Sequence, residues 1–232
     1  MKIAVINFSG NAAKTTIARH LLAPRIQGAE VIAIESINAD DGQTAALRGS
    51  QFGELQEYLQ TVDSVVVDID ASNVEDLLSL MRKYRGSHED FDYFAIPAVP
   101  ALKQQQDTIT TLDALSRLGI RAEKLRVVFN QVEGDAEISV AFDTVLAFAR
   151  QTSLARPSTR CCLGANEIYE RAKAADVDLA TLAADSTDFK ALIARAQTTS
   201  GKLELAQKLA TRSLACGVVP ELDACFAALE LA

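Results

Sequence analysis

Residues 8–16 hold the side chains that are best suited to chemistry in this chain, and they lie between a short apolar run and a helix-like stretch. Their sequence is Phe-Ser-Gly-Asn-Ala-Ala-Lys-Thr-Thr. A loop that joins a strand to a helix directs backbone N–H groups and a helix N-terminus at one point, which suits a phosphate group. Lys14 adds a mobile cation for β- and γ-phosphates, and the Thr15 hydroxyl can complete the coordination of Mg²⁺. We therefore predict a nucleotide-binding loop made by Gly10, Asn11, Ala12, Ala13, Lys14, Thr15 and Thr16.

The loop departs from the usual phosphate-loop pattern at the position before its lysine. Glycine is usual there because it adopts a positive φ and lets the backbone approach a phosphate. Ala13 resists that conformation by about 1–2 kcal/mol. The alternative interpretation is therefore an ordinary helix N-terminus beside a solvated Lys14.

Asp68 is the one charged residue in the apolar run 65–69. A carboxylate at the end of a buried strand beside a phosphate loop can hold Mg²⁺ through water. We therefore predict that Thr15 and Asp68 form a metal site. The alternative is a solvated acidic residue at the end of a strand.

The elements that must position these residues alternate between strands and helices for most of the chain. We expect strands at residues 3–7, 31–34, 65–69, 93–97 and 125–129, and one more short strand at 160–163. The first five runs are almost wholly apolar, as in strands buried on both faces, and amphipathic stretches separate them. This alternation predicts an α/β fold with a mostly parallel β-sheet and helices on both faces. Ligands bind such sheets at the carboxyl ends of the strands.

Local signals predict where several helices begin and end. The first helix, residues 15–23, should end at Pro24, because proline cannot continue a helix. Ser72 and Glu75 have the spacing of a capping box at a helix start. Gly119 should end the helix that precedes the fifth strand.

The pattern of the chain changes after the short sixth strand. From residue 166 onward nearly all of the sequence has a helical pattern, with expected breaks at 198–201 and 217–220. No internal repeat and no flexible linker marks a second independent domain. We therefore expect one domain, residues 1–232, with a helical C-terminal portion from about residue 166.

The composition excludes several classes of protein. The chain has 232 residues, of which 49% are hydrophobic and 23% charged, with a net charge of −8. This apolar content is too high for a disordered chain, and eleven glycines are too few for a collagen-like one. No run reaches the roughly 18 apolar residues of a membrane span, and the four cysteines lack the spacing of a zinc site. We expect a cytoplasmic protein with reduced thiols.

The segment 8–16 resembles the deviant Walker A loop of the ParA/MinD family of P-loop ATPases. That loop has lysine, glycine, glycine, any residue, glycine, lysine and threonine. The matching residues are Gly10, Lys14 and Thr15. The family's signature lysine falls on Ser9, its second glycine on Asn11 and its last glycine on Ala13. The resemblance extends to about residue 182, and within the family the chain is most similar to plasmid stability proteins of the StbB type.

This resemblance implies a protein that binds ATP and Mg²⁺ and is a weak ATPase at most. Lys14 would clamp the phosphates, and Asn130, at the end of the fifth strand, would contact adenine through its amide. The family has two aspartates, one residue apart, after its second strand, and the second of them positions the attacking water. Here Ile37 stands at the second position, so Glu35 or Asp40 would have to take that catalytic role.

The resemblance also implies biological partners. It predicts a role in plasmid stability, plasmid partition or conjugative transfer, with a plasmid-encoded partner protein. It implies a nucleotide-dependent homodimer as well, although Ser9 cannot supply the charge with which the family's lysine reaches the partner's phosphate. DNA is the family's common partner, but the acidic net charge and the scattered basic residues of this chain argue against a large DNA-binding surface.

Two other functions remain open from the sequence. The departures at Ser9, Ala13 and Ile37 favour a ParA-like binding module that has lost nucleotide binding. An ATP-dependent metabolic enzyme of the same fold would need further basic residues after the loop, and Arg19 is the nearby candidate.

Overall fold

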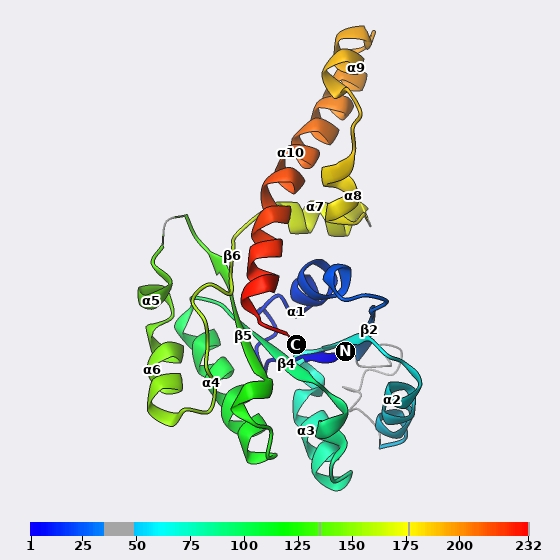
Figure 1. The fold of residues 1–232 in the computed structure, drawn as a ribbon. Helices are drawn as coiled ribbons and strands as arrows, with labels where there is room; N and C mark the ends of the chain where they lie inside the picture. The colour runs from blue at the N-terminus through cyan, green and yellow to red at the C-terminus, as the bar shows by residue number, and fades with distance from the viewer. Residues whose placement is uncertain (35–48, 135, 176, 232) are drawn as a thin grey trace. The chain divides into compact units, whose positions relative to one another are not determined.

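The computed structural model describes residues 1–34, 49–134, 136–175 and 177–231 (Figure 1). Six strands of this part of the chain form one sheet in the order β2-β3-β1-β4-β5-β6, and each neighbouring pair is parallel. The strands are β1 Lys2–Val5, β2 Glu30–Ile34, β3 Val65–Ile69, β4 Tyr93–Ala98, β5 Leu125–Val132 and β6 Cys162–Gly164. The predicted α/β class with a parallel sheet is confirmed.

Four strands end at other residues than the sequence predicts: β4 and β6 each end one residue later than expected, and β1 and β5 differ by more. The first strand was expected to reach residue 7, but β1 ends at Val5. The Ile6 N–H still donates to Ala95 O at 3.0 Å, whereas the Phe8 N–H donates to a side chain, Thr111 Oγ1. The fifth strand is three residues longer than expected because β6 pairs along its end as far as Val132.

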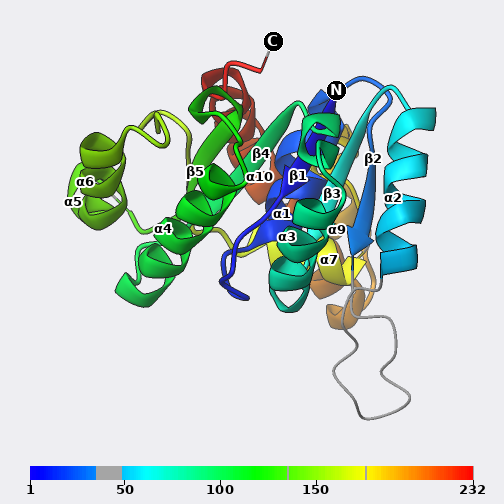
Figure 2. The same cartoon turned by 90° about the horizontal axis from the view of Figure 1, so that it is seen from below.

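Helices cover both faces of the sheet (Figures 1 and 2). One face carries α2 Gly49–Thr61, α3 Val74–Lys83, α4 Leu102–Arg117, α5 Ile138–Ala141 and α6 Asp143–Thr152. The other face carries α1 Lys14–Thr16 with its continuation, the π-helix η1 Ile17–Leu22 and the 3-10 helix η2 Ala23–Arg25. This distribution follows from right-handed crossovers, since the chain moves one way across the sheet from β1 to β2 and the opposite way afterwards.

A hydrophobic core fills the layer between the sheet and helices α2 to α6. Alternate strand residues, such as Ala4, Val67 and Phe129, are fully buried in it. They pack with helix residues that include Leu77 and Leu112. Burial of this kind stabilises the fold by about 25 cal/mol for each Å² of apolar surface removed from water.

The predicted helix ends are confirmed in part. The helix before β5 ends near Gly119, whose φ of 91° is the left-handed conformation expected of a C-terminal glycine. Pro24 lies in η2, directly after the π-helix. The capping box at Ser72 and Glu75 is wrong: Asp70 accepts a hydrogen bond from the Ser72 N–H and caps a 3-10 turn, Ala71–Asn73, that precedes α3. The shorter turn wins because the Asp70 carboxylate reaches the N–H group two residues ahead.

The chain divides into two compact units, residues 1–165 with 225–232, and residues 166–224. The second unit is helical, with α7 Ile168–Ala175, α8 Leu179–Ala184, α9 Phe189–Arg195 and most of α10 Thr199–Ala228. Within it, the Arg212 guanidinium lies 4.9 Å from the centre of the Phe189 ring and donates to Asp185 O at 3.0 Å. Whether the whole chain behaves as the single domain expected from the sequence stays a prediction.

Helix α10 corrects one expectation about the C-terminal portion. The break expected at 198–201 lies a few residues earlier, at 196–198, because α9 ends at Arg195 and α10 begins at Thr199. The break expected at 217–220 is wrong, because α10 runs through Gly217 and Pro220 without interruption. Proline in a helix interior removes one backbone hydrogen bond and crowds the preceding turn. Val218 and Leu222, four residues apart, are both buried, and apolar burial at helical spacing offsets that cost.

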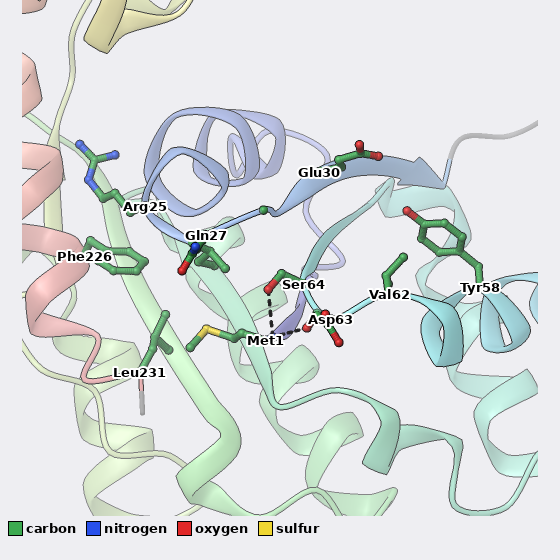
Figure 3. Close-up of a pocket in the computed structure, with 12 residues that line it drawn as sticks. Met1, Arg25, Gln27, Glu30, Tyr58, Val62, Asp63, Ser64, Phe226 and Leu231 are labelled. Atoms are coloured by element: carbon green, nitrogen blue, oxygen red, sulfur yellow. Dashed lines mark hydrogen bonds between the residues drawn. The ribbon is translucent and has the colours of Figure 1, made fainter.

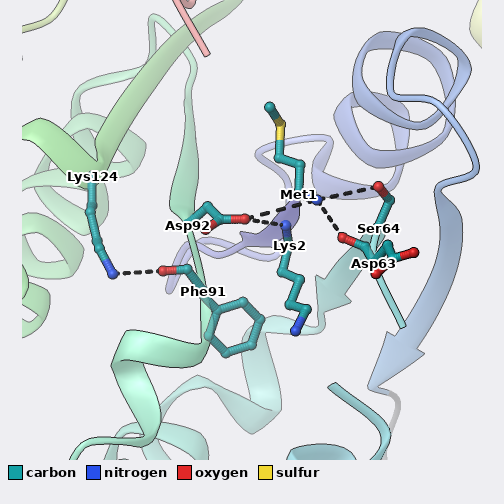
Figure 4. A network of polar contacts seen from close by, with 7 residues as sticks. All are labelled: Met1, Lys2, Asp63, Ser64, Phe91, Asp92 and Lys124. Atoms are coloured by element: carbon teal, nitrogen blue, oxygen red, sulfur yellow. Dashed lines mark hydrogen bonds and ion pairs between the residues drawn. The ribbon is translucent and has the colours of Figure 1, made fainter. Parts of the chain in front are cut away.

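The edge of the sheet where the strands begin has its own polar network (Figure 4). The Met1 amino group donates to Asp63 O and to Ser64 Oγ, and the Lys2 N–H donates to Asp92 Oδ2 at 2.7 Å. A hollow of about 810 Å³ opens beside this network, and its walls include Met1, Arg25, Tyr58, Phe226 and Leu231 (Figure 3). The network ties the starts of three neighbouring strands together.

Two further findings concern the helices and the cysteines. Within the described residues, no helix is both long enough and apolar enough to cross a membrane. The four cysteines are free thiols. Burial raises the pKa of the Cys161 thiol to about 11, and this thiol donates to Ala228 O at 2.9 Å. Cys161 is therefore a structural thiol that stays protonated at neutral pH.

We expect Pro220→Ala to stabilise the protein by about 1–3 kcal/mol, because the alanine restores the missing helix hydrogen bond and removes the steric conflict. Thermal and urea unfolding followed by far-ultraviolet circular dichroism would measure this, since the chain has no tryptophan. Pro24→Ala is the matched control: Pro24 lies at the start of η2, where no N–H partner is needed. An equal or lower stability of Pro220→Ala would contradict the prediction.

Candidate functional site

The register of the sheet places the end of β1 beside the end of β3. Val5 pairs with Asp68, so the chain leaving β1 starts next to the only carboxylate within β3. The loop that follows runs to Lys14, where α1 begins. The structure therefore brings the predicted phosphate loop and the predicted metal-binding carboxylate to one edge of the sheet, the carboxyl edge.

The loop ends in a left-handed turn at Ala13. This residue has φ 57° and ψ 42°, which is the conformation that glycine usually supplies before the lysine of a phosphate loop. The Ile17 N–H then donates to Ala13 O at 3.2 Å and starts the helix. A left-handed residue followed by a helix N-terminus makes an anion-binding concavity.

Lys14 is the buried cation of this site. Its side chain is only 6% exposed, and its Nζ donates to Ser9 O at 2.8 Å, across the loop. Burial lowers the pKa of the ammonium group, and the nearby charges of Asp70 and Asp68 oppose that shift. This burial disagrees with the alternative interpretation, in which Lys14 is solvated beside an ordinary helix N-terminus.

Thr15 and Asp68 are in direct contact. The Thr15 hydroxyl donates to Asp68 Oδ2 at 2.6 Å. Burial raises the pKa of Asp68, while the Thr15 hydrogen bond and the charge of Lys14 lower it. The buried carboxylate therefore lies in an environment that favours its neutralisation by a proton or by a cation.

These two oxygen donors fit the preferences of Mg²⁺, which binds through one or two protein oxygens and keeps several waters and phosphate oxygens. The described residues contain no group of three or more histidine, cysteine or acidic side chains that could hold a metal ion by themselves. A metal at this position would therefore depend on a phosphate ligand.

Asp70 adds a second carboxylate near Lys14. Its Oδ1 accepts hydrogen bonds from the N–H and the hydroxyl of Ser72, at 2.8 and 2.6 Å. These bonds lower the pKa of Asp70, so this carboxylate stays ionised. Asp70 thus supplies the negative charge that partly compensates the buried lysine.

The other predicted site residues are not joined to this cluster. Asn130 is 2% exposed and lies within β5, which continues for two residues beyond it. Since β4 lies between β1 and β5, Asn130 is two strands, or about 10 Å, from the strand that leads into the loop. The predicted catalytic residues Glu35 and Asp40 fall outside the described residues.

The structure also identifies polar residues that the sequence analysis missed. Asn7, Thr108 and Thr111 are fully buried and hydrogen-bond with one another or with the start of the loop. One sequence signal could have pointed to them. Asn7 is a polar residue at the end of an expected buried strand, and two threonines three residues apart share one face of the amphipathic helix after the fourth strand.

Comparisons with known proteins bear on the fold. No protein-family model matches the sequence, and no curated protein sequence matches it. Among solved structures, apo McdA from Cyanothece superposes with a TM-score of 0.52 at 14% identity, covering 90% of this chain and 98% of that one. A Cyanothece McdA variant in complex with ATP gives 0.49 at 14% identity, covering 94% and 96%. The chain therefore has an α/β fold with a parallel sheet that is similar to the fold of McdA.

Proposed function

We propose that this chain binds ATP with Mg²⁺ at residues 10–16 and acts as a slow ATPase of the ParA/MinD type. The observation that carries the proposal is the left-handed turn at Ala13, directly followed by the helix that holds Lys14 and Thr15. An alanine in this conformation costs about 1–2 kcal/mol. A fold that keeps such a turn without glycine has the backbone shape that phosphate binding requires.

Each residue of the cluster has a role in this proposal. The N–H groups of the loop and the helix N-terminus hold phosphate oxygens. The Lys14 ammonium moves from Ser9 O to the β- and γ-phosphates, where its charge balances theirs. Thr15 and Asp68 orient Mg²⁺, and Asn130 contacts the adenine ring. Magnesium supplies neutralisation of the phosphate charge when it is bound.

We expect slow hydrolysis because of the residues that follow the second strand. Phosphoryl transfer needs a residue that orients the attacking water, and little covalent help from the protein. Ile37 occupies the position of the family's second aspartate. Glu35 or Asp40 would have to orient the water instead, so we propose turnover well below that of an efficient ATPase.

The biological role rests on the sequence resemblance. We propose action in plasmid stability, positioning or conjugative transfer, in which nucleotide state switches the affinity for a plasmid-encoded partner. The similarity to StbB-type proteins belongs to the same proposal. The acidic net charge of −8 favours a protein partner over a long DNA contact.

One observation favours a second candidate function, a binding module without nucleotide. The Lys14 ammonium already has a partner in Ser9 O, and Ser9 stands where the family has its signature lysine. A loop that satisfies its own cation would retain the fold without a ligand. A direct measurement of ATP binding separates the two candidates.

Lys14→Ala should weaken ATP·Mg²⁺ binding about 10- to 100-fold, because a charge-assisted hydrogen bond to a phosphate contributes about 1.5–3 kcal/mol. Ala13→Gly should bind at least as tightly as the unaltered chain, since glycine adopts the left-handed turn without strain. Isothermal titration calorimetry measures both, with turnover recorded in parallel. Lys83→Ala, an exposed lysine at the end of α3, is the control. Equal affinities for Lys14→Ala and the unaltered chain would refute the phosphate loop.

Asp68→Asn should raise the melting temperature of the nucleotide-free protein at neutral pH. The folded-state pKa of Asp68 lies above its unfolded value, so the ionised carboxylate destabilises the fold once the pH exceeds both values. The advantage of the variant should therefore disappear as the pH falls below about 4. The same variant should weaken Mg²⁺-dependent ATP binding at least about 10-fold, by analogy with other residues that orient bound metals. A lower melting temperature together with unchanged Mg²⁺ dependence would contradict this role.

A nucleotide-dependent homodimer is also part of the proposal. We expect a mass near two chains with ATP·Mg²⁺ and near one chain without nucleotide, measured by size-exclusion chromatography with light scattering. Because Ser9 lacks the charge of a lysine, the dimer should need higher protein concentrations than a lysine-bearing relative. A mass that nucleotide leaves unchanged up to high protein concentration would exclude the dimer.

A further inference from the structure

Asn7 lies at the root of the phosphate loop and is fully buried. Its Oδ1 accepts a hydrogen bond from the Ser9 N–H at 2.7 Å, inside the first turn of the loop. Its Nδ2 donates to Pro97 O at 2.7 Å and to Thr108 Oγ1 at 2.9 Å. Both amide donors and the amide oxygen therefore have partners. The side chain joins the loop to the end of β4 and to helix α4.

Helix α4 offers two buried hydroxyl groups to this root. Thr108 Oγ1 accepts from Asn7, and Thr111 Oγ1 accepts from the Phe8 N–H at 3.2 Å. Each hydroxyl donates its own proton to a carbonyl one turn back in α4, Gln104 O at 2.9 Å and Asp107 O at 2.8 Å. Because both hydroxyl protons are donated within α4, the lone pairs of the two hydroxyl oxygens can accept hydrogen bonds from Asn7 and Phe8.

We infer that Asn7 is a positioning residue of the phosphate loop, and that α4 sets the shape of the loop through Thr108 and Thr111. The inference rests on the proposed function of that loop. A displacement of α4 would leave one N–H of the Asn7 amide and the Phe8 N–H without their partners. Asn7 is fully buried, so water cannot replace its lost partner. The loop and the helix therefore move together.

The same helix is tied to the elements on its other side. Gln105 is buried, and its Nε2 donates to Ala141 O of α5 at 2.9 Å and to Pro100 O at 2.7 Å. A binding event that shifts α4 or α5 thus changes the affinity of the loop for phosphates, and nucleotide binding changes α4 by the same coupling free energy. This coupling gives the proposed nucleotide site a regulatory element.

Valine variants test the coupling, because valine keeps the shape of threonine and replaces its hydroxyl by a methyl group that forms no hydrogen bond. Thr108→Val and Thr111→Val should each weaken ATP·Mg²⁺ binding about 5- to 30-fold, the size of one hydrogen bond to a buried group. Thr110→Val is the matched control: Thr110 lies on the same helix, is exposed, and makes the same bond one turn back, to Gln106 O. Its affinity should stay within about twofold of the unaltered chain. Thr108→Ser retains the hydroxyl and should recover most of the affinity.

A second measurement separates positioning from a loss of stability. In the unaltered chain, ATP·Mg²⁺ should slow amide hydrogen exchange in α4 as well as in the loop, and in Thr108→Val the slowing in α4 should be lost. Urea unfolding would confirm that each variant is folded. If Thr108→Val does not fold, Thr111→Val carries the same test, because it removes the acceptor of the Phe8 N–H and leaves the hydrogen bonds of Asn7 in place.

The possible failures can be told apart. If the unaltered chain binds ATP and the Thr108→Val and Thr111→Val variants bind it as tightly as Thr110→Val, the inference is overturned and the proposed function stands. If the unaltered chain binds no ATP, the proposed function fails and the inference fails with it.

Discussion

The parallel register between β1 and β3 is the constraint on which the candidate site depends. Because Val5 pairs with Asp68, the loop that leaves β1 begins at the level of the carboxylate. Residues 53 positions apart in the sequence, Thr15 and Asp68, can then share a hydrogen bond. A shift of this register by one residue would turn the Asp68 side chain to the other face of the sheet. The pairing and register of β1 and β3 therefore matter to the site as much as the identity of its residues.

Charge balance explains why the cluster tolerates burial. A buried lysine and a buried aspartate each pay a desolvation cost, and that cost shifts the pKa of each group toward its neutral form. Asp70 offsets part of this cost, since the two hydrogen bonds from Ser72 keep it ionised near Lys14. In the site without a ligand, the charges of Lys14, Asp68 and Asp70 therefore compensate one another only in part. A ligand with its own negative charge would give Lys14 a better partner than a backbone carbonyl.

The sequence predicted the sheet well because each of its strands is a short apolar run. The run 65–69 coincides with β3, which is buried on both faces, and a continuous apolar run is typical of such a strand. The C-terminal helix was harder to predict, since Gly217 and Pro220 are local signals against a helix while the burial of Val218 and Leu222 acts through tertiary packing. Ser72 misled for a similar reason: the competing cap, Asp70, is only two residues away.

The residues of the candidate site also fall into two groups, those that the sequence predicted and those that depend on tertiary packing. Lys14, Thr15 and Asp68 could be predicted because their residue types and their places after strands carry the chemistry. Asn7, Thr108 and Thr111 could not, since their role depends on α4 packing beside the loop, 101 residues away along the chain from Asn7 to Thr108. The sequence analysis also treated Ala13 as an obstacle, although the folded chain holds it in the left-handed turn.

This last difference explains how the proposed phosphate loop can take its shape with few glycines. Glycine lowers the cost of a left-handed turn, but it does not by itself select that turn among the many conformations open to it. Here the loop is fixed at both ends, by Asn7 and Thr111 at its start and by the Ile17-to-Ala13 hydrogen bond at its finish. When surrounding bonds determine a loop, a strained residue can persist at a cost of about 1–3 kcal/mol. The buried hydrogen bonds at the start of the loop therefore hold it in a shape that glycine residues allow in other loops. The conformation of this loop depends on helix α4 as well as on the loop's own sequence.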